Sequence, residues 1–395
     1  MWNTHPQQFW LRGELPAAPV VHDEELGFWH VYGHPEVAEA LGDWGRFSSN
    51  TARLFPELVE GSEGSVLDGN IIQLDPPDHR KLRNLVGRAF TPKVVADLEP
   101  RIERLTRELL DQVGDDFELV RDLAYPLPVT VIAELLGVPA EDRALFKEWG
   151  DRIFEDANQF SLKDEDRVRA DFENQGELIR PMLEYLAAHA AERRRAPRED
   201  LLTALVEAEV DGERLSDVEV VNFASVLLVA GHITTTMLLG NTVLCLDAHP
   251  DQFAAVRADR SLVPAAIEES LRFLTPFASV ARATAKPEVL GGVEVPADQL
   301  LLVWPAAANR DPRRFADPGA FDVGRDPNPH LAFGRGVHFC VGAPLARLEG
   351  RVVLNALFDR FPRLRVDPDR EPVFLPSPNL TGVRSLHLLT DQPPR

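Results

Sequence analysis

Apolar residues along this chain recur mostly at the spacing of helices. One helical stripe is formed by Ile102, Leu105, Leu109, Leu110 and Val113. Segments with strand-like composition are shorter and fewer. The pattern therefore predicts a mainly α-helical protein with a small β region.

The longest apolar stretch, residues 223–246, is predicted to be one buried helix. Ser216 and Glu219 form a capping box that marks its start. The helix is about thirty residues long and apolar on nearly every side, which is typical of a helix at the centre of a large domain. Its glycines and threonines are too frequent for a uniformly apolar membrane span.

The strand signals fall in two regions, about residues 1–50 and 285–305. Residues 289–295 read as a hairpin around Gly291-Gly292, residues 300–303 as a further strand, and residues 27–32 as an early one. Residues 309–339 show no periodicity, and we interpret them as an ordered, functional loop. No change in composition divides the chain, so we predict a single domain over residues 1–395.

Composition and charge narrow the function. The net charge of -21 argues against nucleic acid and an anionic membrane as partners. The two cysteines, Cys245 and Cys340, exclude a disulfide framework and fit the cytoplasm. Met1–Leu11 lacks the character of a signal peptide. We expect a cytoplasmic monomer, a buried Cys245, and a solvated helix end at the basic residues 193–198.

The chemistry is concentrated around Cys340. It lies in Phe-Gly-Arg-Gly-Val-His-Phe-Cys-Val-Gly, residues 333–342, directly before an apolar helix. Glycines allow a tight turn whose N–H groups face the sulfur, and a helix N-terminus with nearby cations stabilises a thiolate. A single exposed thiolate on such a turn suits an axial iron ligand.

This segment resembles the signature of the cytochrome P-450 family, Phe-x-x-Gly-x-(His/Arg)-x-Cys-x-Gly, at every fixed position. The resemblance covers nearly the whole chain. It implies the family fold, with a long central helix over the haem, and haem b held non-covalently through Cys340. It also implies a haem-thiolate monooxygenase that inserts one atom of O2 into a hydrophobic small molecule by hydroxylation or epoxidation.

Two further pairs follow helical spacing. His79 and Arg83, at i and i+4 after a Pro-Pro helix start, place two cationic donors on one face. Glu269 and Arg272, at i and i+3, can pair on another helix. The resemblance makes the first pair haem-propionate ligands and the second a buried structural pair that ties its helix to the cysteine loop. It adds Phe333, Arg282 and His338 to the cofactor-binding set.

The resemblance places oxygen chemistry at Ala230, Gly231 and Thr234. Thr235 and Thr236 are expected to bond back to their own helix carbonyls. The family carries an acid before the threonine, but this chain has Ile233, so the usual proton relay is altered. Four outcomes are open: waters with Thr234 suffice, a substrate hydroxyl helps, oxygen activation is partly uncoupled to peroxide, or the reaction needs no such protonation.

Electrons are expected from NAD(P)H through a separate reductase and ferredoxin. Three arginines flanking the cysteine, Arg335, Arg347 and Arg351, are a candidate docking patch for an acidic ferredoxin. Charge reversal at Arg347 should then slow reduction by ferredoxin more than reduction by dithionite.

Register with the family also gives a candidate substrate pocket: residues 54–72, Val226, Ala278, Ser279, Val280, and the turn at Asn379 and Leu380. The Gly-His-Ile-Thr-Thr-Thr segment looks most like members that tailor polyketides or macrolides, so we predict a secondary-metabolite substrate. The alternatives are peroxide-driven oxidation or oxidative coupling, a non-catalytic family-like partner protein, and a haem sensor.

Overall fold

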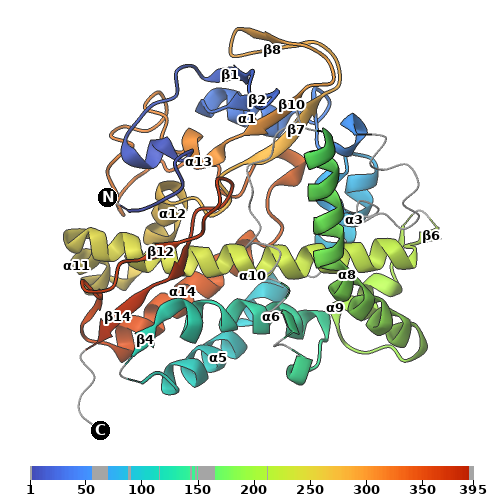
Figure 1. Ribbon diagram of the computed structural model, residues 1–395. Coiled ribbons are helices and arrows are strands. Elements are labelled where there is room, and N and C mark those ends of the chain that lie inside the picture. The colour runs from blue at the N-terminus through green and yellow to red at the C-terminus, as the bar shows by residue number, and fades with distance from the viewer. Residues whose placement is uncertain are drawn as a thin grey trace.

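The central helix α10 (Asp217–Ala248) crosses the whole molecule (Figure 1). This computed structural model describes residues 2–55, 70–87, 90–114, 116–142, 145–146, 149, 165–210 and 212–390. Ser216 accepts a hydrogen bond from the N–H of Glu219, and the Glu219 carboxylate accepts one from the N–H of Ser216, so the predicted capping box is confirmed. By length and composition α10 could cross a bilayer, but 72% of its most apolar window is buried inside the protein.

Helices form most of the core around α10. α6, α8, α12 and α14 pack against it, and α5 lies on the far side of α14 and α6 (Figure 1). Among the described residues, the other α-helices are α1 (His34–Gly42), α3 (Asp78–Gly87), α4 (Pro92–Asp97), α5 (Glu99–Asp111), α6 (Pro126–Leu136), α8 (Glu165–Arg195), α9 (Leu201–Val206), α11 (Pro250–Ala258), α12 (Val263–Phe273), α13 (Pro305–Ala308) and α14 (Ala343–Arg360).

The main sheet lies on the opposite side of α10 from α5, α6 and α14 (Figure 1). Its strand order is β1-β2-β10-β7-β3, from β1 (Val20–Asp23), β2 (Phe28–Val31), β10 (Leu300–Val303), β7 (Val280–Thr284) and β3 (Phe47–Ser48). β8 (Glu288–Leu290) and β9 (Val293–Val295) form the predicted hairpin, with positive φ at both Gly291 and Gly292.

The structure adds strands outside the two regions predicted from sequence. They are β4 (Phe117–Glu118), β5 (Glu209–Val210), β6 (Glu213–Arg214), β11 (Leu364–Val366), β12 (Val373–Phe374), β13 (Val383–Ser385) and β14 (His387–Thr390). β14 pairs with both β11 and β4, so the end of the described chain is joined to the segment after α5. Strands of two to four residues are too short to show a clear alternation.

Residues 194–198 of the basic segment are exposed as expected, and Arg193 is the exception. Arg193 is fully buried rather than solvated: its guanidinium donates to the Asp200 carboxylate at 2.6 Å and to the Gly137 carbonyl at 2.7 Å. Arg194 pairs with Asp217 at the start of α10. A buried arginine needs such partners, and here they join the end of α8 to α6 and α9.

Candidate functional site

The loop before α14 builds a tight cradle for the sulfur of Cys340. The Cys340 N–H donates to the Phe333 carbonyl at 2.8 Å, which closes the loop. Gly334 and Gly336 have φ of 70° and 71°, and a Cβ on Gly336 would lie 2.8 Å from the Leu41 carbonyl oxygen. The backbone of α1 therefore fixes one side of the turn and requires glycine there.

The sulfur lies in a mixed electrostatic environment. Burial raises the pKa of the Cys340 thiol, whereas the N–H groups of Gly342 and Ala343 and the positive charges of Arg83 and Arg347 oppose that rise. These are the groups that favour an anionic sulfur. Within the described residues, no group of three His, Cys, Asp or Glu side chains could hold a metal ion. The Cys340 sulfur is suited to bind a metal that a cofactor brings.

The predicted basic residues come together from three separate segments: α3, β7 and the cysteine loop. The rings of His79 and His338 lie 4.2 Å apart, between centroids, and the charges of Arg83 and Arg282 act on both histidines. Burial, Arg282 and His79 lower the pKa of His338 to about 3. Burial lowers the pKa of Arg282 to about 10, with Asp75 opposing it.

This basic cluster carries unused hydrogen-bonding capacity. His79 is 1% exposed, and neither ring nitrogen has a hydrogen-bond partner within the described chain. Among the described residues, the Arg282 side chain donates one hydrogen bond, to the adjacent Ala281 carbonyl at 2.8 Å. Buried donors that lack partners are costly. A dianion would satisfy them, and the two carboxylates of haem fit that need beside a cysteine sulfur.

On α10, one stripe remains open while most of the helix is covered. Val226, Ala230 and Thr234 are partly or well exposed at a spacing of four, and most of the surrounding positions are buried. Thr234 Oγ1 donates to the Ala230 carbonyl at 2.7 Å, which leaves its lone pairs free to accept. Gly231 is half-buried, and a Cβ there would lie 3.3 Å from Ile132.

The predicted pocket residues separate into two groups. Val226 and Val280 are partly exposed, whereas Ser279 and Leu380 are 3% and 4% exposed and lie behind the surface. Ala278 is fully covered, and its side chain packs into a cluster with Trp10 and Trp304. Of residues 54–72, those at 56–69 lie outside the described residues.

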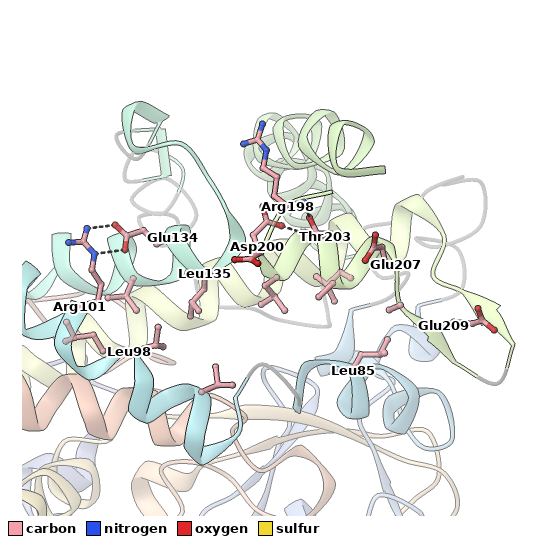
Figure 2. A pocket seen from close by; sticks show the side chains of 18 residues that line it. Leu85, Leu98, Arg101, Glu134, Leu135, Arg198, Asp200, Thr203, Glu207 and Glu209 are labelled. Atoms are coloured by element: carbon pink, nitrogen blue, oxygen red, sulfur yellow. Dashed lines mark hydrogen bonds and ion pairs between the residues drawn. The ribbon is translucent and has the colours of Figure 1, made fainter. Parts of the chain in front are cut away.

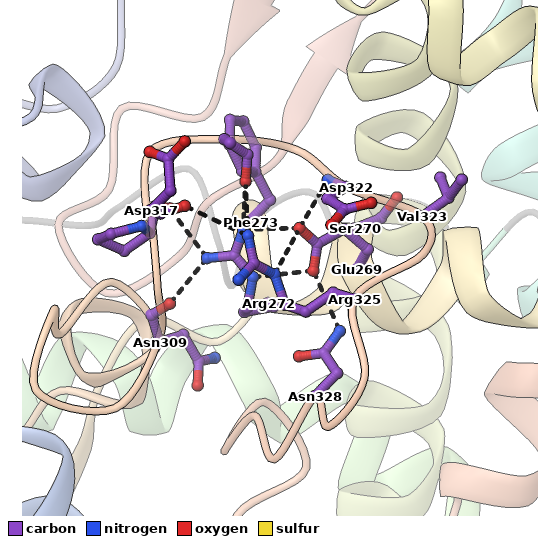
Figure 3. Close-up of polar contacts among 12 residues, drawn as sticks. Glu269, Ser270, Arg272, Phe273, Asn309, Asp317, Asp322, Val323, Arg325 and Asn328 are labelled. Carbon is purple, nitrogen blue, oxygen red and sulfur yellow. Dashed lines mark hydrogen bonds and ion pairs between the residues drawn. The ribbon is translucent and has the colours of Figure 1, made fainter.

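Glu269 and Arg272 form a fully buried ion pair with distances of 2.7 and 2.8 Å (Figure 3). Arg272 also donates to the carbonyls of Asn309, Pro318 and Ala320. Glu269 also accepts from Arg325, Asn328 and the Asp322 N–H. The pair thus connects α12 to the loop that precedes Cys340.

Two of the three arginines that flank Cys340 are already engaged in ion pairs. Arg347 makes two 2.7 Å bonds to Glu268 and lies over the Phe333 ring, 4.5 Å from its centroid. Arg351 donates to Glu99 at 2.6 Å. Arg335 is exposed and forms no ion pair within the described chain.

A surface groove of about 840 Å³ lies between α5, α6 and α9 (Figure 2). Its lining is mainly apolar, and the charged residues at its edge include the Arg101–Glu134 ion pair. None of the predicted cofactor-binding residues lines it. The groove is therefore separate from the site predicted from the sequence around Cys340 and His79.

Comparison with known proteins supports the resemblance to the cytochrome P-450 family over nearly the whole chain. A family model described as Cytochrome P450 matches residues 21–387. The chain is 43% identical to the erythromycin C-12 hydroxylase of Saccharopolyspora erythraea, over 98% of this chain and 95% of that protein. It is 42% identical to the cyclomarin C epoxidase CymV of Salinispora arenicola, over 96% and 94%. A crystal structure of HmtN, a post-tailoring hydroxylase involved in himastatin biosynthesis, has a TM-score of 0.87 at 53% identity, over 99% and 98% of the two chains.

Proposed function

This chain belongs to the cytochrome P450 family and is an oxidoreductase, and we propose that it is a haem-thiolate monooxygenase that tailors a hydrophobic secondary metabolite by hydroxylation or epoxidation. The observation that carries the proposal is that Cys340 feels the positive charge of Arg83 and that, in the same basic cluster, neither ring nitrogen of the buried His79 has a hydrogen-bond partner within the described chain. The relatives named above act on a macrolide, on cyclomarin C and in himastatin biosynthesis. Their range supports the substrate class rather than one compound.

Each part of the site has its own task in this proposal. Cys340 binds the haem iron, Phe333 packs beside it, and His79, Arg83, Arg282 and His338 hold the propionates. When bound, haem supplies the O2 chemistry, and a thiolate ligand favours O–O cleavage. The exposed stripe on α10 lets substrate approach closely at Ala230 and Gly231. Thr234 Oγ1 accepts and passes a proton at that surface.

In this proposal, the electrons come from other proteins. Ferredoxin and a ferredoxin reductase deliver electrons from NAD(P)H, and the enzyme works in the cytoplasm, where its two free cysteines stay reduced. The exposed Arg335 is the arginine of the flanking set most available for docking.

The first test is the carbon monoxide difference spectrum of the reduced, haem-loaded protein. Wild type should give the strongly red-shifted Soret band of thiolate ligation, and Cys340→Ser should lose it while keeping its fold by circular dichroism. Cys245→Ser is the matched control, since Cys245 is fully buried in the core and should not affect the band. A wild-type band typical of histidine or thiol ligation would overturn the proposal.

Peroxide-driven oxidation is the second candidate, and Ile233 favours it. Its side chain belongs to an apolar cluster, so it offers no acid beside Thr234. Turnover with hydrogen peroxide that exceeds turnover with ferredoxin, reductase and O2 would select this alternative.

A further inference from the structure

The N-terminal segment is bound to a turn far away in sequence. Gln8, 1% exposed, directly precedes the short helix η1 (Phe9–Arg12). Its Nε2 lies 3.2, 3.2 and 3.0 Å from the carbonyl oxygens of Ser377, Pro378 and Leu380. An amide has two N–H donors, so one of them is shared between two carbonyls.

The remaining carbonyls of this turn, residues 377–381, are also bound. The Asn379 carbonyl accepts from the Ala278 N–H at 2.8 Å, and the Thr381 carbonyl accepts from Asn241 Nδ2 at 2.8 Å. Thus five consecutive carbonyls have donors, although the turn lies outside every strand. Buried carbonyls require partners, and Gln8 provides them for three of the five.

Gln8 is itself fixed by its neighbours. Trp10 is 3% exposed and packs with Ala278 and Trp304, with 5.3 Å between the two indole centroids. The same Ala278 donates its N–H to the turn. The segment carrying Gln8 and the segment before β7 that carries Ala278 therefore hold the turn from two sides.

Besides the hydrogen bond from Asn241, the turn contacts α10 through the side chain of Leu380. Leu380 forms a buried apolar cluster with Ile233 and Met237. Ile233 directly precedes Thr234, the residue on the open stripe of α10. A shift of the turn would therefore be passed on to the surface that faces substrate.

We propose that Gln8 is a positioning residue for substrate specificity, which holds the 377–381 turn so that Leu380 stays packed against Ile233 beside Thr234. This inference rests on the proposed function, since it assumes that the open stripe of α10 faces the haem and the substrate. Gln8 acts only through the turn and contacts no reacting group.

Gln8→Glu is the sharpest variant, because it keeps the shape but replaces the donor with an acceptor facing three carbonyls. Gln8→Ala removes the amide without adding a charge and gives a second reading if the glutamate variant does not fold. Gln7→Ala is the matched control, because the Gln7 side chain makes no hydrogen bond within the described chain.

Two measurements on the haem-loaded full chain test the proposal. Hydrogen exchange at the amides of Ala278 and Thr381, which bond across the turn, should accelerate in both Gln8 variants. In spectral titrations, the Gln8 variants should bind 4-phenylimidazole roughly 3- to 10-fold more weakly than wild type, about the effect of one lost hydrogen bond. Their affinity for imidazole should be nearly unchanged, because imidazole is too small to reach the turn. In Gln8→Glu, low pH should partly restore both, because a protonated carboxyl can donate.

Each result separates this inference from the proposed function. Unchanged exchange and an unchanged affinity ratio in folded Gln8 variants would overturn the positioning role. An equal loss of affinity for 4-phenylimidazole and imidazole, together with a lower Tm, would show that Gln8 contributes only to stability. That result would also overturn the positioning role. If wild type shows no thiolate spectrum, the proposed function fails, whereas hydrogen exchange still reads whether Gln8 holds the turn.

Discussion

Ile233 directly precedes Thr234 on α10, and its side chain has a packing role. It is 7% exposed and lies against Met237 and Leu380. Thr235 and Thr236 donate to the carbonyls four residues earlier, at 3.1 and 3.0 Å, so the expected back-bonding is confirmed for both. On this part of α10, Thr234 alone combines a hydroxyl with the open stripe.

Ile233→Glu tests the altered proton relay. Burying a carboxyl in the apolar cluster should raise its pKa and cost about 1–3 kcal/mol of stability, as for other unpaired buried polar groups. We expect a lower Tm together with a changed coupling of electrons to product and a changed solvent isotope effect. Ile233→Val is the control for packing alone. If Ile233→Glu left turnover, coupling and isotope effect as in wild type, the altered-relay hypothesis would be wrong.

Among the helices, α14 contains an unusual buried carboxyl. Glu349 is 1% exposed, and its Oε2 has no hydrogen-bond partner within the described chain. Burial raises the pKa of Glu349 to about 8. At neutral pH the folded protein therefore keeps a proton that the unfolded chain has lost.

The pH dependence of stability follows from that raised pKa. The contribution of Glu349 is fully present below the unfolded pKa of 4.5 and is lost as pH rises towards 8. Glu349→Gln should remove this loss, which is at most about 5 kcal/mol at 1.36 kcal/mol per pKa unit. We expect the Tm of the variant, relative to wild type, to be higher at pH 8 than at pH 5. Parallel Tm curves over this range would contradict the raised pKa.

At the scale of the whole molecule, the Glu269–Arg272 pair joins α12 to a long loop without regular structure. Apart from the 3-10 turn Gly336–His338, residues 309–339 form no helix or strand, yet Arg272 and Glu269 bind six of their groups (Figure 3). The position of the cysteine loop thus depends on a contact made elsewhere in the fold.

Glu269→Gln should destabilise the protein by about 3–5 kcal/mol, because Arg272 and Arg325 would remain as buried charges without their carboxylate. Haem should be retained less well, measured as the loss of Soret absorbance on gel filtration. Glu268→Gln is a suitable control. The Glu268 side chain, next to Glu269 in the chain, is 29% exposed, so its loss should destabilise the protein less. Equal Tm values for the two variants would argue against a special role for the buried pair.

The surface arginines give a prediction about reduction. Arg347→Glu removes a cation but also breaks the bonds to Glu268, so it should slow reduction by ferredoxin and lower the Tm. Arg335→Glu should slow reduction of the enzyme by ferredoxin roughly 10-fold at low salt, through lost electrostatic attraction alone. Stopped-flow reduction by ferredoxin and by dithionite separates these effects. If ferredoxin reduces both variants as fast as wild type, ferredoxin does not dock on this surface.

Local patterns in the sequence predicted the elements that depend on neighbouring residues. The capping box, α10, the Gly-Gly hairpin and the helical stripe of α5 each follow from spacing within a few residues, and the structure confirms them. The motif around Cys340 identified the family because its glycines, histidine and cysteine stand together in the chain. The shortest strands carried too few residues for any period.

The amino-acid sequence by itself therefore determined the family, the central helix and the cysteine loop, whose physical requirements are local. Only the tertiary structure decided the burial of Arg193, the covering of Ala278 by tryptophans, and the contact of Gln8 with a turn 369 positions away. Such contacts follow from how distant segments pack, and no periodicity in either segment records its partner. An arginine or glutamine reads as polar and solvated until the fold provides buried carbonyls and carboxylates that need its hydrogen bonds.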